Sequence, residues 1–423
     1  MARPIIRIAV DPGYSSIKVV IEGTIITIPS EVIENTGNED KFLSEKKEGF
    51  ASITEFGKNY LVGNYARKLL LEENRQKQQD VNQSVLEDFD RFGTQYFEIS
   101  MKAAIGIALV KYCEMSYKKN YDQKVRVEEL ENCDIYLAIA VPHAVYELKN
   151  KGPVGLMKNR LYNTPHEYVL ELAEKTYELK YTIKNDCKYR FQSQVVAALL
   201  GTLVDEFDEE MDIIQQGDSD KPILVIDGGY RTVGIFKLSQ IDSVEEAESN
   251  KDFAMALVDE RVAEIMKERG REDIKCYNIQ EYYDTQEEIT VLDDGHTHTI
   301  TINKEREEIA AEYCGIMIDY LREKYNNLLP IKQILITGGT GAAYYGTFLR
   351  YIDTHPDMAH LKGKVKLAQY KFYGQQATPM HTIVCGLYKQ FKRYLDQTLI
   401  QEPAQKQANN VRKANAGNSR KEG

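Results

Sequence analysis

The sequence has no tryptophan, no pair of cysteines spaced as C-x-x-C and no apolar run that approaches 18 residues. Without such a run, no segment is expected to cross a membrane as a helix. The six cysteines stand singly along the chain, which predicts reduced thiols in a cytoplasmic protein rather than disulfides or a zinc site. Residues 1–4 also lack the apolar core of a signal peptide and lead directly into a predicted strand.

Positive charge is scarce as well. The 423 residues include 54 lysines and arginines against 65 acidic residues, which gives a net charge of −11. A general nucleic-acid-binding protein usually has the opposite sign, so direct binding to nucleic acid is not expected. Hydrophobic residues make up 43% of the chain, and the length allows two domains with separate cores.

Two common phosphate-binding loops are missing, because there is no G-x-x-x-x-G-K-[ST] sequence and no G-x-G-x-x-G after the first predicted strand. Three glycine turns are present instead. They follow apolar segments at residues 5–10, 223–226 and 331–337, which are predicted to be strands, and a helix is expected later at 344–354. Glycine lets bare backbone approach a ligand, and successive N–H groups in such turns bind anions.

The first two turns form a weak internal repeat of a strand, an acidic glycine turn and a returning strand. They begin at Asp11 and Asp227. A carboxylate beside a polyphosphate is repelled unless a cation lies between them, and Mg²⁺ binds through one or two carboxylates plus phosphates while keeping several waters. The two aspartates therefore predict a metal–nucleotide site, in which Lys18 adds positive charge against the phosphates.

In order and context, the three turns resemble the phosphate-1, phosphate-2 and adenosine loops of the actin, Hsp70 and sugar-kinase superfamily. Residues 194–199 (QVVAAL) and 384–388 (VCGLY) resemble its two connecting helices. Within the superfamily, the sequence resembles the bacterial actin-like proteins of the ParM type, which segregate plasmids. This narrower resemblance rests on residues 60–66 (YLVGNYA), on residues 138–142 (AIAVP) and on a chain too short for the substrate-binding region of Hsp70.

The resemblance implies an α/β, actin-like fold of two related domains, each with a mixed β-sheet flanked by helices, and a nucleotide in the cleft between them. Domain I would span residues 1–205, with a helix at 381–400 returning to it. Domain II would span 206–380, with a smaller subdomain inserted at about 255–305. Residues 403–423 lack apolar periodicity and are predicted to form a disordered, basic tail.

The resemblance also implies roles for individual residues. Asp11 and Asp227 would hold a hydrated Mg²⁺ and help to orient the attacking water, and Gln194 would position that water. Gln192 is the alternative if the alignment slips by two. The nucleotide is expected to contact the three turns at Gly13, Tyr14, Ser15, Ser16, Lys18, Gly228, Gly229, Tyr230, Arg231, Thr232, Gly338, Gly339 and Thr340. Tyr230 and Arg231 stand where smaller residues are usual, and Thr340 replaces a glycine.

The implied function is slow hydrolysis of ATP, or of GTP, stimulated by polymerisation. The implied partners are further copies of the chain in a filament and a DNA-binding adaptor protein on a plasmid. One alternative is a small-molecule kinase of the same fold, although no additional motif supplies a base for a substrate hydroxyl. Another is an FtsA- or PilM-like cytoskeletal scaffold, although residues 403–423 have too few apolar side chains for a membrane anchor.

Overall fold

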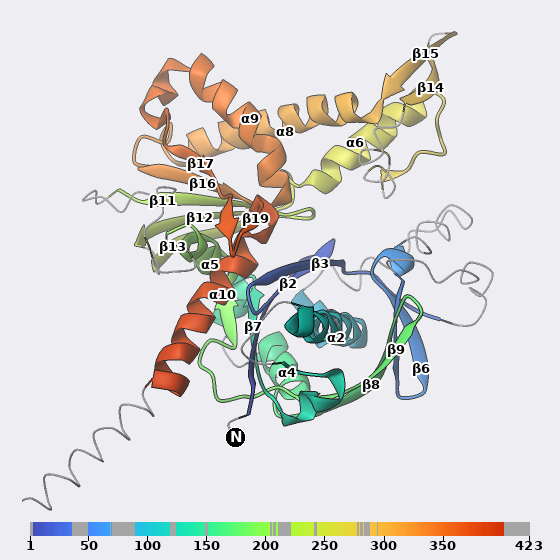
Figure 1. The fold of residues 1–423 in the computed structure, drawn as a ribbon. Helices are drawn as coiled ribbons and strands as arrows, with labels where there is room; N and C mark the ends of the chain where they lie inside the picture. Colours follow the sequence, from blue (N-terminus) through green and yellow to red (C-terminus); the bar gives the residue numbers. More distant parts are fainter. Residues whose placement is uncertain are drawn as a thin grey trace, which may run out of the picture.

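The computed structural model describes residues 3–35, 50–67, 69, 89–118, 124–148, 151–203, 205, 209, 221–240, 243–276, 279, 282, 288–293 and 295–401. These residues form two α/β halves, which Figure 1 shows one above the other, with the last long helix, α10, running between them. The predicted tail at 403–423 lies outside the described residues, so the prediction of disorder is not tested.

The first half is built on a five-stranded sheet in the order β10-β7-β1-β2-β3. Strands β1 and β2 form an antiparallel hairpin, and β7 runs parallel to β1 on its other side. Side chains alternate along β1, so that Ile8 and Val10 belong to one core while Ala9 belongs to another. The strands are β1 (Ile5–Pro12), β2 (Ser16–Ile21), β3 (Thr24–Pro29), β7 (Asp134–Val141) and β10 (Phe191–Ser193).

Helix α2 (Gln95–Lys118) fills the space between this sheet and a second one in the first half (Figure 1). The helix is buried on nearly every side, because both sheets press on it. Its Lys102 lies in that core and pairs with Glu55 and Glu98. The second sheet has the order β4-β6-β5-β8-β9, with β4 (Val32–Glu34), β5 (Ala51–Glu55), β6 (Lys58–Val62), β8 (Pro165–Leu172) and β9 (Lys175–Thr182).

The second half repeats the topology of the first. Its sheet has the order β13-β12-β11-β16-β17, in which β11 and β12 form an antiparallel hairpin and β16 runs parallel to β11. This is the arrangement of β2, β1 and β7, so the weak repeat in the sequence corresponds to a repeated fold. The strands are β11 (Ile223–Gly228), β12 (Val233–Gln240), β13 (Ser243–Asn250), β16 (Gln333–Thr337) and β17 (Val365–Leu367).

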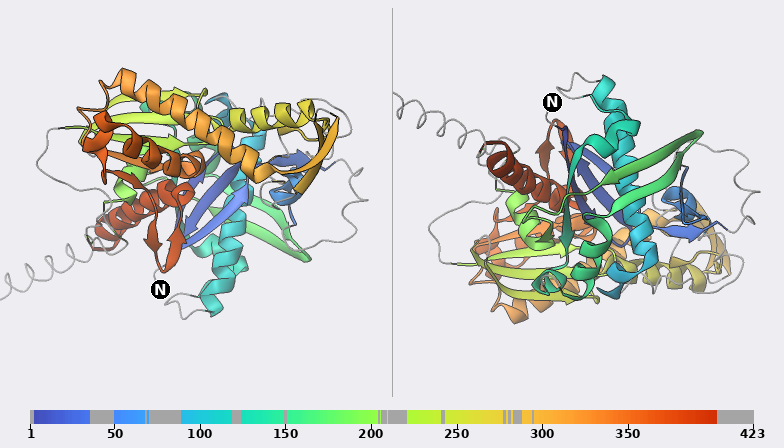
Figure 2. Two further views of the ribbon diagram at one scale, coloured as in Figure 1. Left: turned by 90° about the horizontal axis from the view of Figure 1, so that it is seen from above. Right: turned by 90° about the horizontal axis from the view of Figure 1, so that it is seen from below.

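Three helices and a hairpin complete the second half. Helices α6 (Met255–Glu268), α8 (Ile302–Lys324) and α9 (Gly338–Thr354) share one core with the sheet. The hairpin of β14 (Glu288–Asp293) and β15 (His296–Thr301) stands at the far end of α6 and α8, as Figure 2 also shows. Within this region Arg306 Nε donates to Asp259 Oδ1 over 2.6 Å, which joins α8 to α6.

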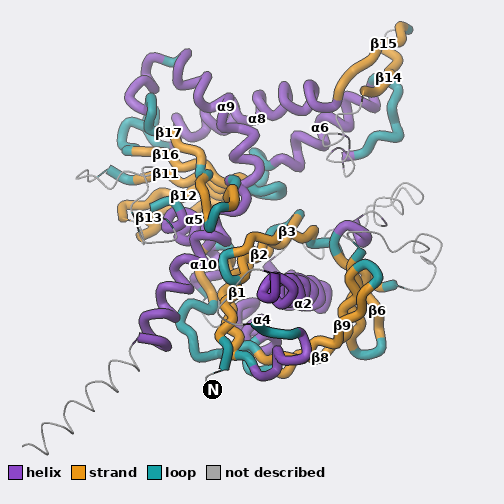
Figure 3. Tube along the Cα trace, viewed as in Figure 1, coloured by secondary structure: helices purple, strands orange, loops and turns teal. Residues whose placement is uncertain are grey.

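Shorter elements connect the two halves and cover their edges (Figure 3). Among the described residues they are η2 (Phe89–Gly93), η3 (Val127–Asn132), α3 (His143–Glu147), α4 (Gly152–Leu161), α5 (Gln194–Gly201), η5 (Pro356–Leu361), β18 (Tyr370–Phe372), β19 (Gln375–Ala377), η6 (Pro379–His381) and the π-helical turn η7 (Asp396–Gln401), which follows α10 (Thr382–Leu395).

Helices α5 and α10 cross between the halves at unusually short distance. A Cβ added at Gly386 would lie 1.9 Å from the carbonyl oxygen of Ala197, and one added at Gly201 would lie 2.9 Å from that of Thr382. Helix α5 has two contact faces. Ala197 shares a core with α10 and with the sheet β10-β7-β1-β2-β3 of the first half, whereas Val195 shares one with the sheet β13-β12-β11-β16-β17 of the second half. Through α5, the crossing therefore contacts one sheet from each half.

Candidate functional site

The first glycine turn lies between β1 and β2 and is tightly folded. Asp11, at 2% exposure, is directly opposite Lys18 in the hairpin, and their side chains form an ion pair with 3.6 Å between Oδ2 and Nζ. A Cβ at Gly13 would lie 2.6 Å from Lys18 Nζ and 2.7 Å from the carbonyl oxygen of Ser16. Glycine is needed here because the backbone carbonyl of Ser16 cannot move aside as easily as the flexible end of Lys18.

Other side chains hold this turn from outside. Ser30 Oγ donates to the carbonyl oxygen of Tyr14, and Arg67 donates to that of Ser15. Ser16 itself is buried and pairs with Pro29 in the sheet. The backbone carbonyls of the turn are thus occupied by the protein. Sequence reasoning missed Ser30 and Arg67, because nothing in their own sequence marks them as neighbours of residues 14 and 15.

The second glycine turn follows β11 and is pressed against the third. A Cβ at Gly228 would lie 2.1 Å from the backbone nitrogen of Gly341, and one at Gly338 would lie 2.3 Å from the carbonyl oxygen of Gly228. Within the turn, the N–H of Gly229 donates to the carbonyl oxygen of Thr232 over 2.9 Å. No side chain larger than hydrogen fits at this crossing, which accounts for glycines in both turns.

The carboxylates of the two turns act on each other across the two halves. Burial raises the pKa of Asp227 to about 7, with a further contribution from the negative charge of Asp11. Lys18 opposes this shift, but it is already paired with Asp11. Two carboxylates that act on each other, with Lys18 paired to only one of them, would be stabilised by a further cation.

The third glycine turn is the first turn of helix α9. We predicted the helix at 344–354, and this start is wrong because α9 begins at Gly338. Glycine is a poor helix former, which hides such a start from sequence patterns. Gly338 has φ +79°, a left-handed value that favours glycine, and it places Gly339 at the exposed start of the helix. Thr340 is buried and its Oγ1 donates to the carbonyl oxygen of Gly229 over 2.7 Å, so the departure from glycine ties the third turn to the second.

Gln194 and Gln192 lie in different places. Gln194 is the first residue of α5, and its Nε2 donates to Asp11 Oδ1 over 2.7 Å. Gln192 lies in β10, and its Nε2 donates to Gln390 Oε1 over 3.3 Å. The geometry thus brings Gln194, rather than the alternative Gln192, to the aspartate of the first turn.

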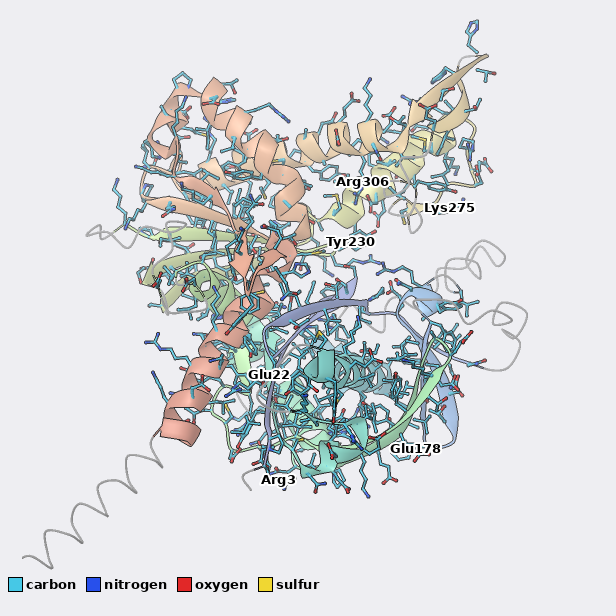
Figure 4. All side chains as sticks on the ribbon, viewed as in Figure 1. Arg3, Glu22, Glu178, Tyr230, Lys275 and Arg306 are labelled. Carbon is cyan, nitrogen blue, oxygen red and sulfur yellow. The ribbon has the colours of Figure 1, made fainter. Side chains whose placement is uncertain are left out.

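Tyr230 connects the second turn to the helices above it. Its hydroxyl hydrogen-bonds to Asp259, which also accepts from Arg306. Figure 4 labels Tyr230 and Arg306, both in the second half. Burial, together with the charge of Asp259, raises the pKa of Tyr230 well above its ordinary value. The guanidinium of Arg231 lies 5.6 Å from the Tyr230 ring. Tyr230 therefore links this turn to α6 and α8, a contact that no pattern in the sequence predicts.

Two further residues near the first turn were not predicted. Arg91 Nη2 donates to the carbonyl oxygen of Pro12 over 2.6 Å. His381 contacts Thr27 Oγ1 at 2.9 Å and Thr378 Oγ1 at 3.0 Å through its two ring nitrogens. Burial and the charge of Lys18 lower the pKa of His381, although Asp11 acts in the opposite direction.

The donor set fits a magnesium–phosphate group better than a metal held by protein alone. In the part of the chain that the structure describes, no three His, Cys, Asp or Glu side chains are grouped to hold a metal. Asp11 and Asp227 would offer two hard oxygen ligands, and their mutual repulsion would be relieved by a cation. Mg²⁺ typically takes one or two carboxylates, with phosphates and waters as its remaining ligands.

Comparison with known proteins identifies the fold. No family model and no curated protein matches the sequence. The crystal structure of the actin-like protein Alp7A aligns with 96% of this chain and 99% of its own, with a TM-score of 0.62 at 14% identity. The chain has the actin-like fold.

Two further structures with the actin-like fold are of ParM. One is ParM in a 15-stranded filament from Clostridium botulinum, which covers 92% of this chain and 99% of its own with a TM-score of 0.56 at 14% identity. The other is Bacillus thuringiensis ParM with ATP, which covers 93% and 99% with a TM-score of 0.54 at 12% identity. The predicted actin-like architecture is confirmed.

The helices of the described residues were also tested for membrane crossing. None of them is both long enough and apolar enough to span a bilayer. The division at residue 205 and the subdomain at about 255–305 stay predictions, as do the roles assigned to residues of the three turns.

Proposed function

We propose that the protein is an ATPase that polymerises and that holds Mg²⁺ and a nucleoside triphosphate between the turns at Asp11, Asp227 and Gly338. The observation that carries the proposal is the pair of aspartates from equivalent turns of the two halves, with Gln194 hydrogen-bonded to one of them. Alp7A and the ParM structures, one of them with ATP and one a filament, support it.

The residues divide the work between binding and positioning. Lys18 and the N–H groups of the turns would neutralise the phosphates, as such turns do elsewhere. Mg²⁺, when bound, would supply positive charge that neutralises the two aspartates. Gln194 donates its amide N–H to Asp11, which leaves its amide oxygen to accept a hydrogen bond from the attacking water.

An amide orients water but does not take its proton, so the expected hydrolysis is slow. Hydrolysis would remove contacts to the terminal phosphate and shift the two halves toward another relative position, as in other nucleotide switches. Assembly would then depend on the nucleotide. The filament partner is a second copy of the chain, and the plasmid-bound adaptor is proposed from the likeness to Alp7A and ParM alone.

Light scattering with ATP and Mg²⁺ tests this proposal. A signal that rises on addition of ATP and decays as phosphate is released is the expected result. The same protein is then incubated with sugars or acetate. Stoichiometric phosphorylation of one of these compounds without scattering would show a small-molecule kinase and refute the filament.

Replacing Gln194 with alanine is expected to lower the turnover number on the order of 100-fold, since a positioned water is lost. The Kd for ATP should stay within about twofold, because the amide is assigned to the water. Gln192→Ala is the matched control: its side chain bonds to Gln390 on α10, so turnover should be retained. Equal losses in the two variants would contradict the role of Gln194.

A further inference from the structure

Arg91 is a buried arginine next to the first glycine turn, and no described side chain forms an ion pair with it. We propose that Arg91 is the positioning residue of this turn, and that a bound triphosphate provides the negative charge that its guanidinium lacks. The inference rests on the proposed function, because it assigns a task in the same nucleotide site. Arg91 lies in η2 (Phe89–Gly93), immediately before α2, and its guanidinium reaches the backbone of the first glycine turn at Pro12.

Arg91 fixes the turn at two points. Its Nη2 donates to the carbonyl oxygen of Pro12 over 2.6 Å, and its guanidinium carbon lies 4.1 Å from the centre of the Tyr14 ring. A second ring, that of Phe92, lies 4.7 Å away. The planar guanidinium thus bonds with its edge and stacks with its face. These contacts set the peptide between Pro12 and Gly13 and the side chain of Tyr14.

Within the described part of the chain, the charge of Arg91 has no counter-ion. The side chain is 4% exposed, and its Nε is buried without a hydrogen-bond partner. Among the described residues no carboxylate lies within ion-pair distance of it. Asp11 is the acid whose charge acts on Arg91, but Asp11 already contacts Lys18 and Gln194.

An unpaired buried charge destabilises a folded protein, whereas the same charge stabilises a bound anion. Burial correspondingly lowers the pKa of Arg91. Removing the guanidinium should therefore raise the stability of the protein without ligand and lower its affinity for ATP. A residue that only packs the core gives the opposite pattern, in which stability falls and affinity stays.

The test compares the full chain with Arg91→Met by two measurements. In thermal unfolding without nucleotide, the Tm of the variant should equal or exceed that of wild type. In calorimetric titration with ATP and Mg²⁺, the Kd should rise about tenfold or more, since the buried positive charge that attracts the phosphates is lost. The KM for ATP should rise with it, while kcat at saturating ATP changes less.

Two further variants sharpen the experiment. Arg126→Met removes an exposed guanidinium that contacts Tyr117 and should change neither Tm nor Kd. Arg91→Lys keeps the charge but not the planar fork, so it should bind ATP more weakly than wild type and more tightly than Arg91→Met. If Arg91→Met does not fold, the lysine variant decides, and wild-type affinity in it overturns the proposal.

The outcomes separate the two proposals. A wild-type protein that binds ATP, together with an Arg91→Met variant of lower Tm and unchanged Kd, would overturn the role of Arg91 alone. A wild-type protein that does not bind ATP would overturn the proposed function and this inference with it.

Discussion

Asp227→Asn is expected to reduce Mg²⁺-dependent ATP hydrolysis on the order of 100-fold or more and, at the same time, to stabilise the protein without nucleotide. The first effect follows because an amide is a poor Mg²⁺ ligand and carries no charge. The second follows because the substitution removes one of two facing carboxylates, whose repulsion and burial raise the pKa of Asp227 to about 7. A loss of hydrolysis together with a gain in stability would indicate that the two carboxylates serve to bind a cation.

The pH dependence of stability supplies the matched measurement. Between pH 4 and pH 7 the folded protein binds the Asp227 proton, whereas the unfolded chain, with an ordinary carboxyl pKa of about 3.9, has released it. Stability without nucleotide should therefore fall as the pH rises through this window and level off above pH 7. Asp227→Asn should lack this fall, which thermal unfolding at several pH values will show. Asp227→Ala should lose hydrolysis equally, and wild-type turnover in either variant would contradict the metal assignment.

The second large effect is expected at the helix crossing. Gly386→Ala places a methyl group 1.9 Å from the carbonyl oxygen of Ala197, where backbone must move to admit it. We expect the free energy of unfolding to fall by about 1–3 kcal/mol or more, although alanine is the better helix former. ATP binding should weaken too, because α5, which α10 crosses here, shares cores with the sheets of both halves.

Gly346→Ala is the control for the crossing. Gly346 lies in α9 with nothing within 4 Å of an added Cβ, so the same substitution should raise stability by about 0.5–1 kcal/mol. Urea unfolding of the two variants measures both changes. Equal stabilisation by both substitutions would mean that α5 and α10 lie farther apart at Gly386 than the structure shows.

The sequence predicts those parts of the site in which the chemically important residues directly follow a strand along the chain. The turns at Asp11 and Asp227 follow apolar strands, and their repetition matches the shared topology of the two sheets. The sequence predicts that the glycines of the third turn let a ligand approach the backbone. It does not predict that they begin a helix, because the close contact of Gly338 with Gly228 exists only in the folded protein.

The residues that support the turns could not be predicted from the sequence. Arg91 reaches Pro12 from an element 79 positions away, and His381 reaches Thr27 across 354 positions. Tyr230 appeared as a departure from the family pattern, and its partner Asp259 belongs to a charged stretch without a motif. Such contacts depend on which elements pack together, and a single sequence does not reveal that packing.

The position of Gln194 has a further consequence. It is the first residue of α5, the helix whose two faces are shared between the sheets, and it bonds to Asp11 of the first half. A rotation of one half against the other would therefore shift this amide relative to Asp11. Under the proposed function, hydrolysis would then start only in the relative position of the halves that aligns the amide with the water, and neighbouring protomers in a filament would hold that position.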